Sequence, residues 1–430
     1  MFRNSKIFGD LSWTSLASIT ISILGIVKIS ILARILDVND FGSLAIGLFI
    51  FGLIEILSDL GLSAIVMHKV DLTLSEFSSL FILNIFIAVI LFFGIQFGSI
   101  SVSFLYNENV LAELIKSLSY VVLFSALGRL FKALHHKGER FKLLALIEVI
   151  SNVIGTLIAI ICALKELGLA SYIYGLLAQH LVQNVLFFYT GLKYQGIIFS
   201  LNLKELSNDL KIGRFQSGSL IINYFNRDLD VLLVGKFFGT TVLGNYSLAK
   251  QLAYKPYQFL VPIVSKVSLP RLAGVQNNLK LLTLNYKKLL SSFSLVIITI
   301  YAFLFLFAEG AVCILYGNGY IIANELRFFC GIMMIRSILS PVGSLLVALG
   351  KTKLDFYWSI YSTLWIPVIV YFCYSFEIEV FMTAIMLSLI LNIYPFWYML
   401  IKPSLGIPFL EFLSYHFSFS SFRDMKRKND

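Results

Sequence analysis

The stretch SSLFILNIFIAVILFFGIQFGSI, residues 78–100, carries no charged side chain from end to end. A membrane-spanning helix needs about 20 mostly apolar residues, because the hydrocarbon core is about 30 Å thick and a helix rises about 1.5 Å per residue. This stretch therefore predicts a transmembrane helix, and the pattern recurs along the chain.

The recurring apolar stretches predict about twelve spans. They are 13–33, 41–62, 78–100, 112–134, 143–164, 169–191, 213–236, 243–263, 289–309, 321–348, 355–375 and 379–401. Composition agrees with this interpretation, since 58% of the residues are hydrophobic and only 13% are charged, whereas typical soluble domains are about 25% charged. We expect an all-α integral membrane protein.

The net charge of +10 is spread over many short loops. A nucleic-acid-binding protein would gather its basic residues in one patch or stripe, so no nucleic-acid partner is expected. Short cytoplasmic loops carry an excess of Lys and Arg. With the N-terminus inside, the outer loops hold only Arg34, Lys116, Lys165 and Lys236, which predicts that both termini are cytoplasmic.

A weak internal repeat suggests a duplicated transporter. Arg34 precedes Gly42 by the same number of residues as Lys236 precedes Gly244, and each pair joins one span to the next. We expect two six-helix lobes around a central cavity, although chance similarity between apolar segments is an alternative. The predicted parts are an N-terminal lobe at 1–192, a cytoplasmic linker at 193–212, a C-terminal lobe at 213–402 and a basic cytoplasmic tail at 403–430.

Ionisable residues inside spans cost roughly 2.5–3.5 kcal/mol each on insertion scales, so they usually face a cavity or a partner. In the seventh span, Asn223, Arg227 and Asp230 share one face by their i, i+4, i+7 spacing. Asp228 is expected to point elsewhere, toward a neighbouring helix. The alternative is that Arg227 pairs with Asp228 or Asp230 and merely holds helices together.

The eighth span places Ser247, Gln251, Lys255 and Gln258 on one face, with Lys250 beside it. Such a polar face is typical of a helix that lines a wet cavity. Alternatively, Lys250 or Lys255 extends to the membrane surface.

Lys28 in the first span and Arg336 in the tenth have no opposite charge on their own helix. Together with the cations of the seventh and eighth spans they predict a cationic cavity. Its candidate residues are Lys28, Arg227, Lys250, Lys255 and Arg336.

Carboxylates inside the spans are candidates for ion coupling. Glu55 and Asp59 lie four residues apart on one face of the second span, Glu148 lies in the fifth, and Asp230 in the seventh. Two neighbouring carboxylates disfavour each other's ionisation, which suits coupling to H⁺ or Na⁺. Alternatively, they neutralise Lys28 or a cation of another span. No phosphate-binding loop or metal motif is present in the sequence, so no cofactor is expected.

Several segments resemble the Wzx-type polysaccharide (O-antigen) flippases of the multidrug/oligosaccharidyl-lipid/polysaccharide (MOP) exporter superfamily. These segments are ILARILDVNDFGSLAI (31–46), ILSDLGLSAIVMHK (56–69), RLFKALHHKGERFKLLALIEV (129–149), DVLLVGKFFGTTVLGNYSLA (230–249) and PRLA (270–273). They cover both halves of the chain. The resemblance implies a transporter without enzymatic activity, in the bacterial plasma (inner) membrane.

The resemblance also implies a substrate, an undecaprenyl-pyrophosphate-linked oligosaccharide that moves from the cytoplasmic to the outer leaflet by alternating access. A pyrophosphate needs cationic partners, which the predicted cavity would supply. Membrane lipids, a polysaccharide polymerase and a chain-length regulator are the expected partners. The alternatives are a multidrug or lipid II exporter of the same superfamily and, from a different class, a membrane polysaccharide polymerase.

Overall fold

A computed structural model describes residues 2–198, 203–317 and 319–417, with side chains described for 13–198, 217–317 and 319–416. The described residues form two compact units. Unit 1 extends to Gly244 and also includes Leu315–Gly317, and unit 2 contains the other described residues. The predicted basic tail lies outside the described residues from position 418 onward.

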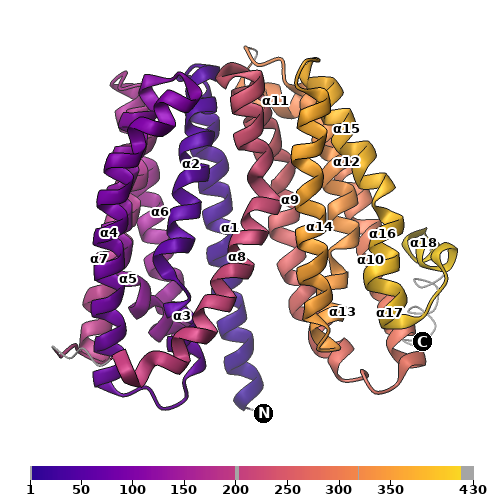
Figure 1. The fold of residues 1–430 in the computed structure, drawn as a ribbon, viewed down its shortest axis with the longest axis horizontal. Coiled ribbons are helices and arrows are strands. Elements are labelled where there is room, and N and C mark those ends of the chain that lie inside the picture. The colour runs from indigo at the N-terminus through magenta and orange to yellow at the C-terminus, as the bar shows by residue number, and fades with distance from the viewer. Residues whose placement is uncertain (1, 199–202, 318, 418–430) are drawn as a thin grey trace. The chain divides into compact units, whose positions relative to one another are not determined.

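Figure 1 shows that the chain consists of long helices joined by short connections. The first eight helices belong to unit 1. They are α1 (Phe2–Ala33), α2 (Val38–Asp59), α3 (Leu62–His68), α4 (Leu74–Tyr106), α5 (Asn109–Lys137), α6 (Phe141–Leu164), α7 (Ala170–Tyr194) and α8 (Leu203–Phe238).

The remaining helices lie wholly or mostly in unit 2. They are α9 (Thr240–Ala273), α10 (Leu279–Leu306), α11 (Ala308–Tyr316), α12 (Ala323–Leu339), α13 (Pro341–Ala348), α14 (Thr352–Cys373), α15 (Ile378–Leu391), α16 (Ile393–Phe396), the π-helix η1 (Trp397–Ile401), α17 (Lys402–Leu405) and α18 (Phe409–Phe417).

Nine helical stretches among the described residues are long and apolar enough to cross a membrane. One of them is Leu74–Tyr106, which contains the uncharged stretch at 78–100 and has a mean hydropathy of 2.6. The predicted spans at 169–191, 213–236 and 243–263 lie on α7, α8 and α9, which are not among the nine. Every predicted span falls on one to three consecutive helical elements, so the prediction of an all-α membrane protein is confirmed.

Small residues bring α6 and α7 into contact along their main chains. A methyl group on Gly155 would lie 2.7 Å from the carbonyl oxygen of Gly175, and one on Gly175 would lie 2.6 Å from that of Gly155. In lipid, such residues allow two helices to approach closely, which strengthens their van der Waals packing. The contact fixes the position of α7, which carries His180.

The two repeat glycines make a reciprocal contact in unit 1. A methyl group on Gly42 would lie 1.9 Å from the carbonyl oxygen of Thr240, and one on Gly244 would lie 2.0 Å from that of Val38. Val38 precedes Gly42 by as many residues as Thr240 precedes Gly244. A pair of equivalent helices related by a local two-fold axis would make this contact.

Helix α8 packs on the N-terminal helices of unit 1. The hydroxyl of Tyr224 donates a hydrogen bond of 2.8 Å to the carbonyl oxygen of Phe49 on α2. A methyl group on Gly52 would lie 2.4 Å from the same hydroxyl, so α2 is narrow where Tyr224 crosses it. The division of the chain into two duplicated lobes, at 1–192 and 213–402, stays a prediction.

The core of unit 2 includes the fully buried Tyr286 together with the buried Trp397 and Phe412. Trp397 begins η1, and its indole N–H donates a hydrogen bond of 3.0 Å to the carbonyl oxygen of Ile407. Next along the chain, α18 packs on α10, where the Nδ1 atom of His416 lies 3.0 Å from the hydroxyl of Ser294. The last span is thereby tied to the segment that precedes α18, and α18 itself is tied to α10.

Candidate functional site

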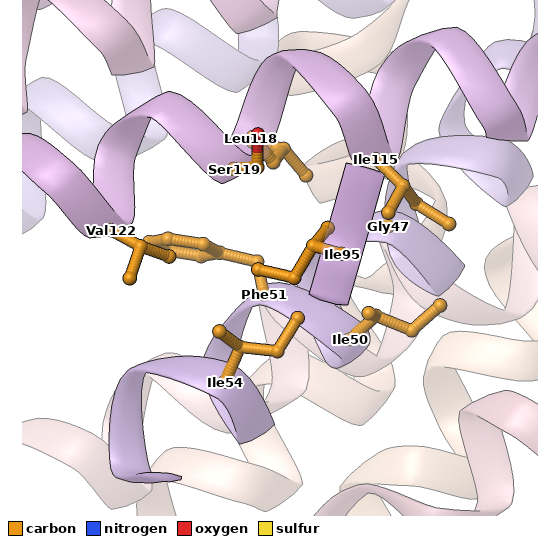
Figure 2. A pocket seen from close by; sticks show the side chains of 9 residues that line it. All are labelled: Gly47, Ile50, Phe51, Ile54, Ile95, Ile115, Leu118, Ser119 and Val122. Atoms are coloured by element: carbon orange, nitrogen blue, oxygen red, sulfur yellow. The ribbon is translucent and has the colours of Figure 1, made fainter. Parts of the chain in front are cut away.

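A small apolar cavity lies inside unit 1, among α2, α4 and α5. Phe51, Ile95, Ile115 and Val122 are among the side chains that line it (Figure 2), and its volume is about 10 Å³. A space of this size holds one water molecule at most, and apolar cavities usually stay dry. It is a packing defect, too small for a phosphate or a sugar.

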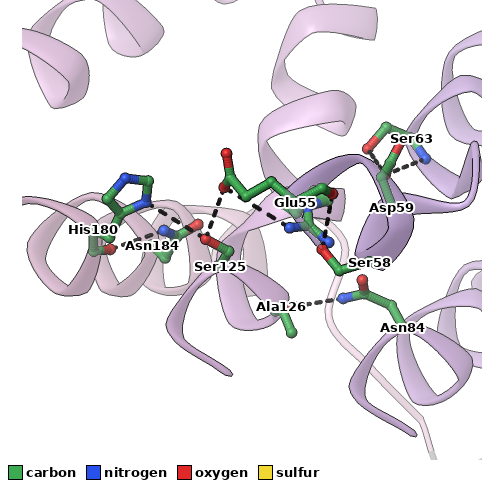
Figure 3. A network of polar contacts seen from close by, with 10 residues as sticks. Glu55, Ser58, Asp59, Ser63, Asn84, Ser125, Ala126, His180 and Asn184 are labelled. Carbon is green, nitrogen blue, oxygen red and sulfur yellow. Dashed lines mark hydrogen bonds and ion pairs between the residues drawn. The ribbon is translucent and has the colours of Figure 1, made fainter. Parts of the chain in front are cut away.

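Three polar side chains of unit 1, Glu55, Ser125 and His180, form a network close to this cavity. Glu55 lies on the face of α2 that also carries the cavity residue Phe51. Ser125 of α5 lies between Glu55 of α2 and His180 of α7 (Figure 3). Its hydroxyl donates to the Oε1 atom of Glu55 at 3.3 Å and lies 3.5 Å from the Nδ1 atom of His180. The network therefore joins three helices through side chains that can donate, accept or carry a proton.

Arg129 supplies the positive charge of this network. One of its terminal guanidinium nitrogens lies 4.0 Å from the Oε1 atom of Glu55. The Arg129 side chain is 12% exposed and that of Glu55 is 36% exposed. Both terminal nitrogens of Arg129 are buried and lack a hydrogen-bond partner among the described residues. A buried guanidinium with unused N–H groups can take up an anion or a water molecule without losing another bond.

Asp59 and Glu148, two further coupling candidates, each have a partner of their own. The Oδ1 atom of Asp59 accepts hydrogen bonds from the hydroxyl of Ser63 at 2.6 Å and from its backbone N–H at 3.2 Å. The Oε1 atom of Glu148 lies 2.7 Å from the Nζ atom of Lys132. Glu55 and Glu148 each lie near a cation of another predicted span. The cation is Arg129 for Glu55 and Lys132 for Glu148. The alternative interpretation of these carboxylates allowed for such pairs.

Lys28 is a buried cation of α1, with 8% of its surface exposed. Its Nζ atom lies 4.8 Å from the centre of the Tyr172 ring on α7. An ammonium group over an aromatic face is stabilised by the ring quadrupole while its N–H groups stay available. Lys28 is therefore a buried cation whose N–H groups can meet an anion.

Arg227 forms an ion pair with its neighbour in the sequence. Its Nε atom lies 2.6 Å from the Oδ2 atom of Asp228, and this is one of the two pairs that the alternative interpretation named. The guanidinium also lies 5.1 Å from the centre of the Tyr224 ring. Helical spacing places Asp230 on the same face of α8 as Arg227. The arginine side chain is also long enough to reach the adjacent residue, Asp228.

The other predicted site residues are divided between the two units. Asp230 is buried in unit 1, and Lys250 is buried in unit 2. Lys255 and Arg336 are half-buried in unit 2. Lys28 and Arg227 belong to unit 1, so the gathering of the five cations around one cavity stays a prediction.

Neither Arg129 nor Ser125 is among the site residues predicted from the sequence. Arg129 lies inside the predicted span 112–134, so the criterion that selected Lys28, an ionisable residue within a span, would also have found it. Ser125 carries no comparable signal, because serine is common in transmembrane helices and most of its hydroxyls bond to their own backbone. Only the structure shows that it bridges Glu55 and His180.

Three curated proteins show what the sequence is similar to. The lipopolysaccharide biosynthesis protein WzxC of Escherichia coli (strain K12) is 28% identical over 415 residues, which cover 96% of this chain and 84% of WzxC. The amylovoran biosynthesis protein AmsL of Erwinia amylovora is 27% identical, and the match covers 82% of this chain and 91% of AmsL. The teichuronic acid biosynthesis protein TuaB of Bacillus subtilis (strain 168) is 24% identical over 82% and 73%.

Two solved structures share the fold. The lipid II flippase MurJ, in an inward closed conformation, matches with a TM-score of 0.75 at 15% identity, over 94% of this chain and 90% of MurJ. An inward-facing multidrug resistance MATE family transporter of the MOP superfamily matches with a TM-score of 0.64 at 14% identity, over 88% and 95%. At these identities the likeness shows a shared fold and nothing more.

These similarities confirm the resemblance to Wzx-type proteins of the MOP superfamily. The sequence profile of the family described as "Polysaccharide biosynthesis protein" matches residues 31–324, which is more than half of the chain. This chain therefore belongs to the polysaccharide biosynthesis protein family, as a multi-pass membrane protein with the fold of a transporter.

Proposed function

We propose that this protein flips undecaprenyl-pyrophosphate-linked oligosaccharide repeat units from the cytoplasmic to the outer leaflet of the bacterial plasma membrane. The observation that carries the proposal is the family match over residues 31–324 in a chain with an exporter fold. The named relatives belong to the biosynthesis of lipopolysaccharide, amylovoran and teichuronic acid. The protein would act as a secondary transporter and not as an enzyme.

Cationic side chains within the spans would hold the pyrophosphate. Lys28 is buried against an aromatic ring, which leaves its N–H groups free for phosphate oxygens. Lys28, Arg227, Lys250, Lys255 and Arg336 are the proposed substrate contacts, and they would meet the headgroup in one cavity as the protein alternates between inward-facing and outward-facing states. The lipid tails would remain in the bilayer.

The carboxylates would couple transport to H⁺ or Na⁺. Moving one charge across the membrane is worth about 2.3 kcal/mol per 100 mV, so an inside-negative potential favours export of an anionic headgroup. The coupled ion would then serve to return the empty carrier. Glu55, Asp59, Glu148 and Asp230 are the proposed coupling residues, and Glu55 has the most suitable surroundings because Ser125 connects it to His180.

Both termini would be cytoplasmic, as the distribution of Lys and Arg over the loops predicts. A polysaccharide polymerase and a chain-length regulator would use the flipped repeat units. They are proposed partners on the basis of the reaction sequence, since a repeat unit must reach the outer leaflet before it can be polymerised there.

The test is deletion of the gene in its own host, followed by extraction of lipid-linked intermediates and labelling of the sugars that face outward. We expect repeat units to accumulate on the cytoplasmic leaflet, and the native gene to restore export. Lys28→Gln should restore it poorly. Lys165→Gln, which removes an exposed cation from the end of α6, is the matched control and should restore it fully.

The same strains distinguish the alternatives. A multidrug exporter would change the susceptibility of the deletion strain to cationic drugs without accumulation of repeat units. A lipid II exporter would affect peptidoglycan synthesis, and a polymerase would leave single repeat units on the outer leaflet. Any of these results would contradict the proposal.

A further inference from the structure

A surface cavity lies at the turn between α5 and α6, far along the chain from the proposed substrate contacts. It has a volume of about 370 Å³. Its lining consists of Glu139, Arg140, Phe141, Lys142, Leu143 and Leu146. Because the turn joins two membrane-spanning helices, the cavity lies where the bilayer meets water. It thus has two cations, one carboxylate and apolar walls at the depth of lipid headgroups.

Aromatic rings hold both cations in place. The guanidinium of Arg140 lies 3.5 Å from the centre of the Tyr194 ring, and the Nζ atom of Lys142 lies 5.3 Å from that of Trp13. A guanidinium stacked face-on to a ring keeps its N–H groups at the edge, where they can meet a phosphate. Aromatic side chains are also frequent at this depth of the membrane.

Neighbouring cations are already paired, whereas those of the cavity are not. Lys69 lies 2.7 Å from Glu76, and Lys132 lies 2.7 Å from Glu148. Among the described side chains, no carboxylate lies within ion-pair distance of Arg140 or Lys142. The positive charge of Arg140 and Lys142 can therefore bind an anion that is not part of the protein.

An exposed apolar stripe leads from the cavity along α6. Leu146, Ile150, Leu157 and Ile161 follow one another on one face of the helix and are 42–54% exposed. At about 1.5 Å per residue, this stripe is about 22 Å long, which is longer than one leaflet of a bilayer core about 30 Å thick. Acyl chains can lie along it.

We propose that this cavity binds an anionic phospholipid of the surrounding bilayer, with its phosphate on Arg140 and Lys142 and its acyl chains along the α6 stripe. The net positive charge of the lining favours a headgroup with a net negative charge over a zwitterionic one. Binding here is separate from the proposed function, because none of the proposed substrate or coupling residues takes part.

The experiment measures lipid binding to the purified full-length protein by native mass spectrometry. Phosphatidylglycerol and phosphatidylcholine with the same acyl chains are added in equal amounts. We expect the native protein to retain phosphatidylglycerol preferentially. In the double variant Arg140→Gln/Lys142→Gln the preference should fall by up to about 25-fold, since one basic residue at an anionic surface contributes roughly fivefold.

Lys165→Gln is the matched control, because it removes one cation from the opposite end of α6. It should keep the preference for phosphatidylglycerol. A second variant, Leu146→Ala/Ile150→Ala, keeps both cations and should bind phosphatidylglycerol more weakly because it shortens the apolar stripe. All the changed residues are exposed or half-buried, so each variant is expected to fold. Circular dichroism and size-exclusion chromatography verify this.

Three outcomes would overturn the proposal. The first is equal retention of the two lipids by the native protein. The second is an unchanged preference in Arg140→Gln/Lys142→Gln. The third is displacement of phosphatidylglycerol by millimolar glycerol 3-phosphate, which would show that the cavity binds a free phosphate ester and that the acyl chains contribute nothing.

Discussion

The Cα atom of Gly42 lies so close to Thr240 that a methyl group there would come within 1.9 Å of its carbonyl oxygen. The equivalent glycine of the second repeat, Gly244, has the same relationship to Val38, at 2.0 Å. The hydroxyl of Thr240 also lies 2.5 Å from the Oδ1 atom of Asn39 and 2.8 Å from the Oε1 atom of Glu108. The start of α2 and the start of α9 therefore form one tightly packed contact.

Gly42→Ala and Gly244→Ala should each destabilise the protein. The obstructing atoms are backbone and cannot move aside by a rotamer change, so we expect a loss of about 1–3 kcal/mol, as for other overpacked sites. Thermal unfolding of the purified protein in detergent measures the loss. Gly94→Ala is the control, because a methyl group there meets nothing within 4 Å and alanine favours a helix over glycine. Equal melting temperatures in all three variants would contradict the packing argument.

Glu55→Gln should leave Arg129 as an uncompensated buried cation. We expect a destabilisation of about 1–3 kcal/mol, less than the 3–5 kcal/mol typical of fully buried pairs, because Glu55 is partly exposed. The double variant Glu55→Gln/Arg129→Met should regain most of the loss, as a double-mutant cycle would show.

Glu113→Gln is the control for this pair, since Glu113 is an exposed carboxylate on α5. It should change stability by less than about 0.5 kcal/mol. Additive effects of the Glu55 and Arg129 substitutions would mean that the two side chains do not interact.

Docking of α18 should weaken in mild acid. Burial lowers the pKa of His416 to about 4, whereas an unfolded histidine titrates near 6.5. Between pH 6.5 and pH 4 the undocked segment binds more protons than the docked one, so the free energy of docking falls as the pH falls through this range. It is unchanged above pH 6.5.

Hydrogen exchange of residues 409–417, corrected for intrinsic rates, measures this effect at pH 7.5 and pH 5. We expect protection to decrease at pH 5 in the native protein. In His416→Phe protection should be the same at both values, because phenylalanine does not titrate. A native protein with equal protection at both pH values would show that His416 is not buried when neutral.

The predicted topology places Cys313 on the outer side of the membrane. Cys313 is exposed on α11, whereas Cys162 is half-buried and Cys330 and Cys373 are buried. A membrane-impermeant maleimide should therefore label the native protein in intact spheroplasts, and Cys313→Ser should remove most of the label. Labelling that appears only after the spheroplasts are lysed would invert the assignment of both termini to the cytoplasm.

The membrane fold was predictable because its signal is strong and local. A span such as 78–100 is apolar over its whole length, and no soluble helix needs that pattern. The predicted spans on α7, α8 and α9 are helical, but their polar residues make this signal weaker, and these helices are not among the nine that are long and apolar enough to cross a membrane.

The partners of the polar residues were not predictable in the same way. The spacing of Arg227 and Asp230 indicates a shared face, but it does not show that the Arg227 side chain also reaches its neighbour Asp228. The bridge of Ser125 between Glu55 and His180 depends on the packing of three helices. A single sequence indicates which residues share one face of a helix. It does not indicate which helix faces pack against each other.

The π-helix η1 within the last span has a consequence for any alignment of this region. A π-turn holds one residue more than an α-turn and is how a helix accommodates a single inserted residue without unfolding. Deleting one residue between Trp397 and Ile401 should restore an ordinary α-helix and leave the segments on either side of it in their present orientation, because the π-turn absorbs the extra residue. The carbonyl of Ile407 would then stay near the Trp397 indole, so a relative without the extra residue can keep the same anchor for its C-terminal segment.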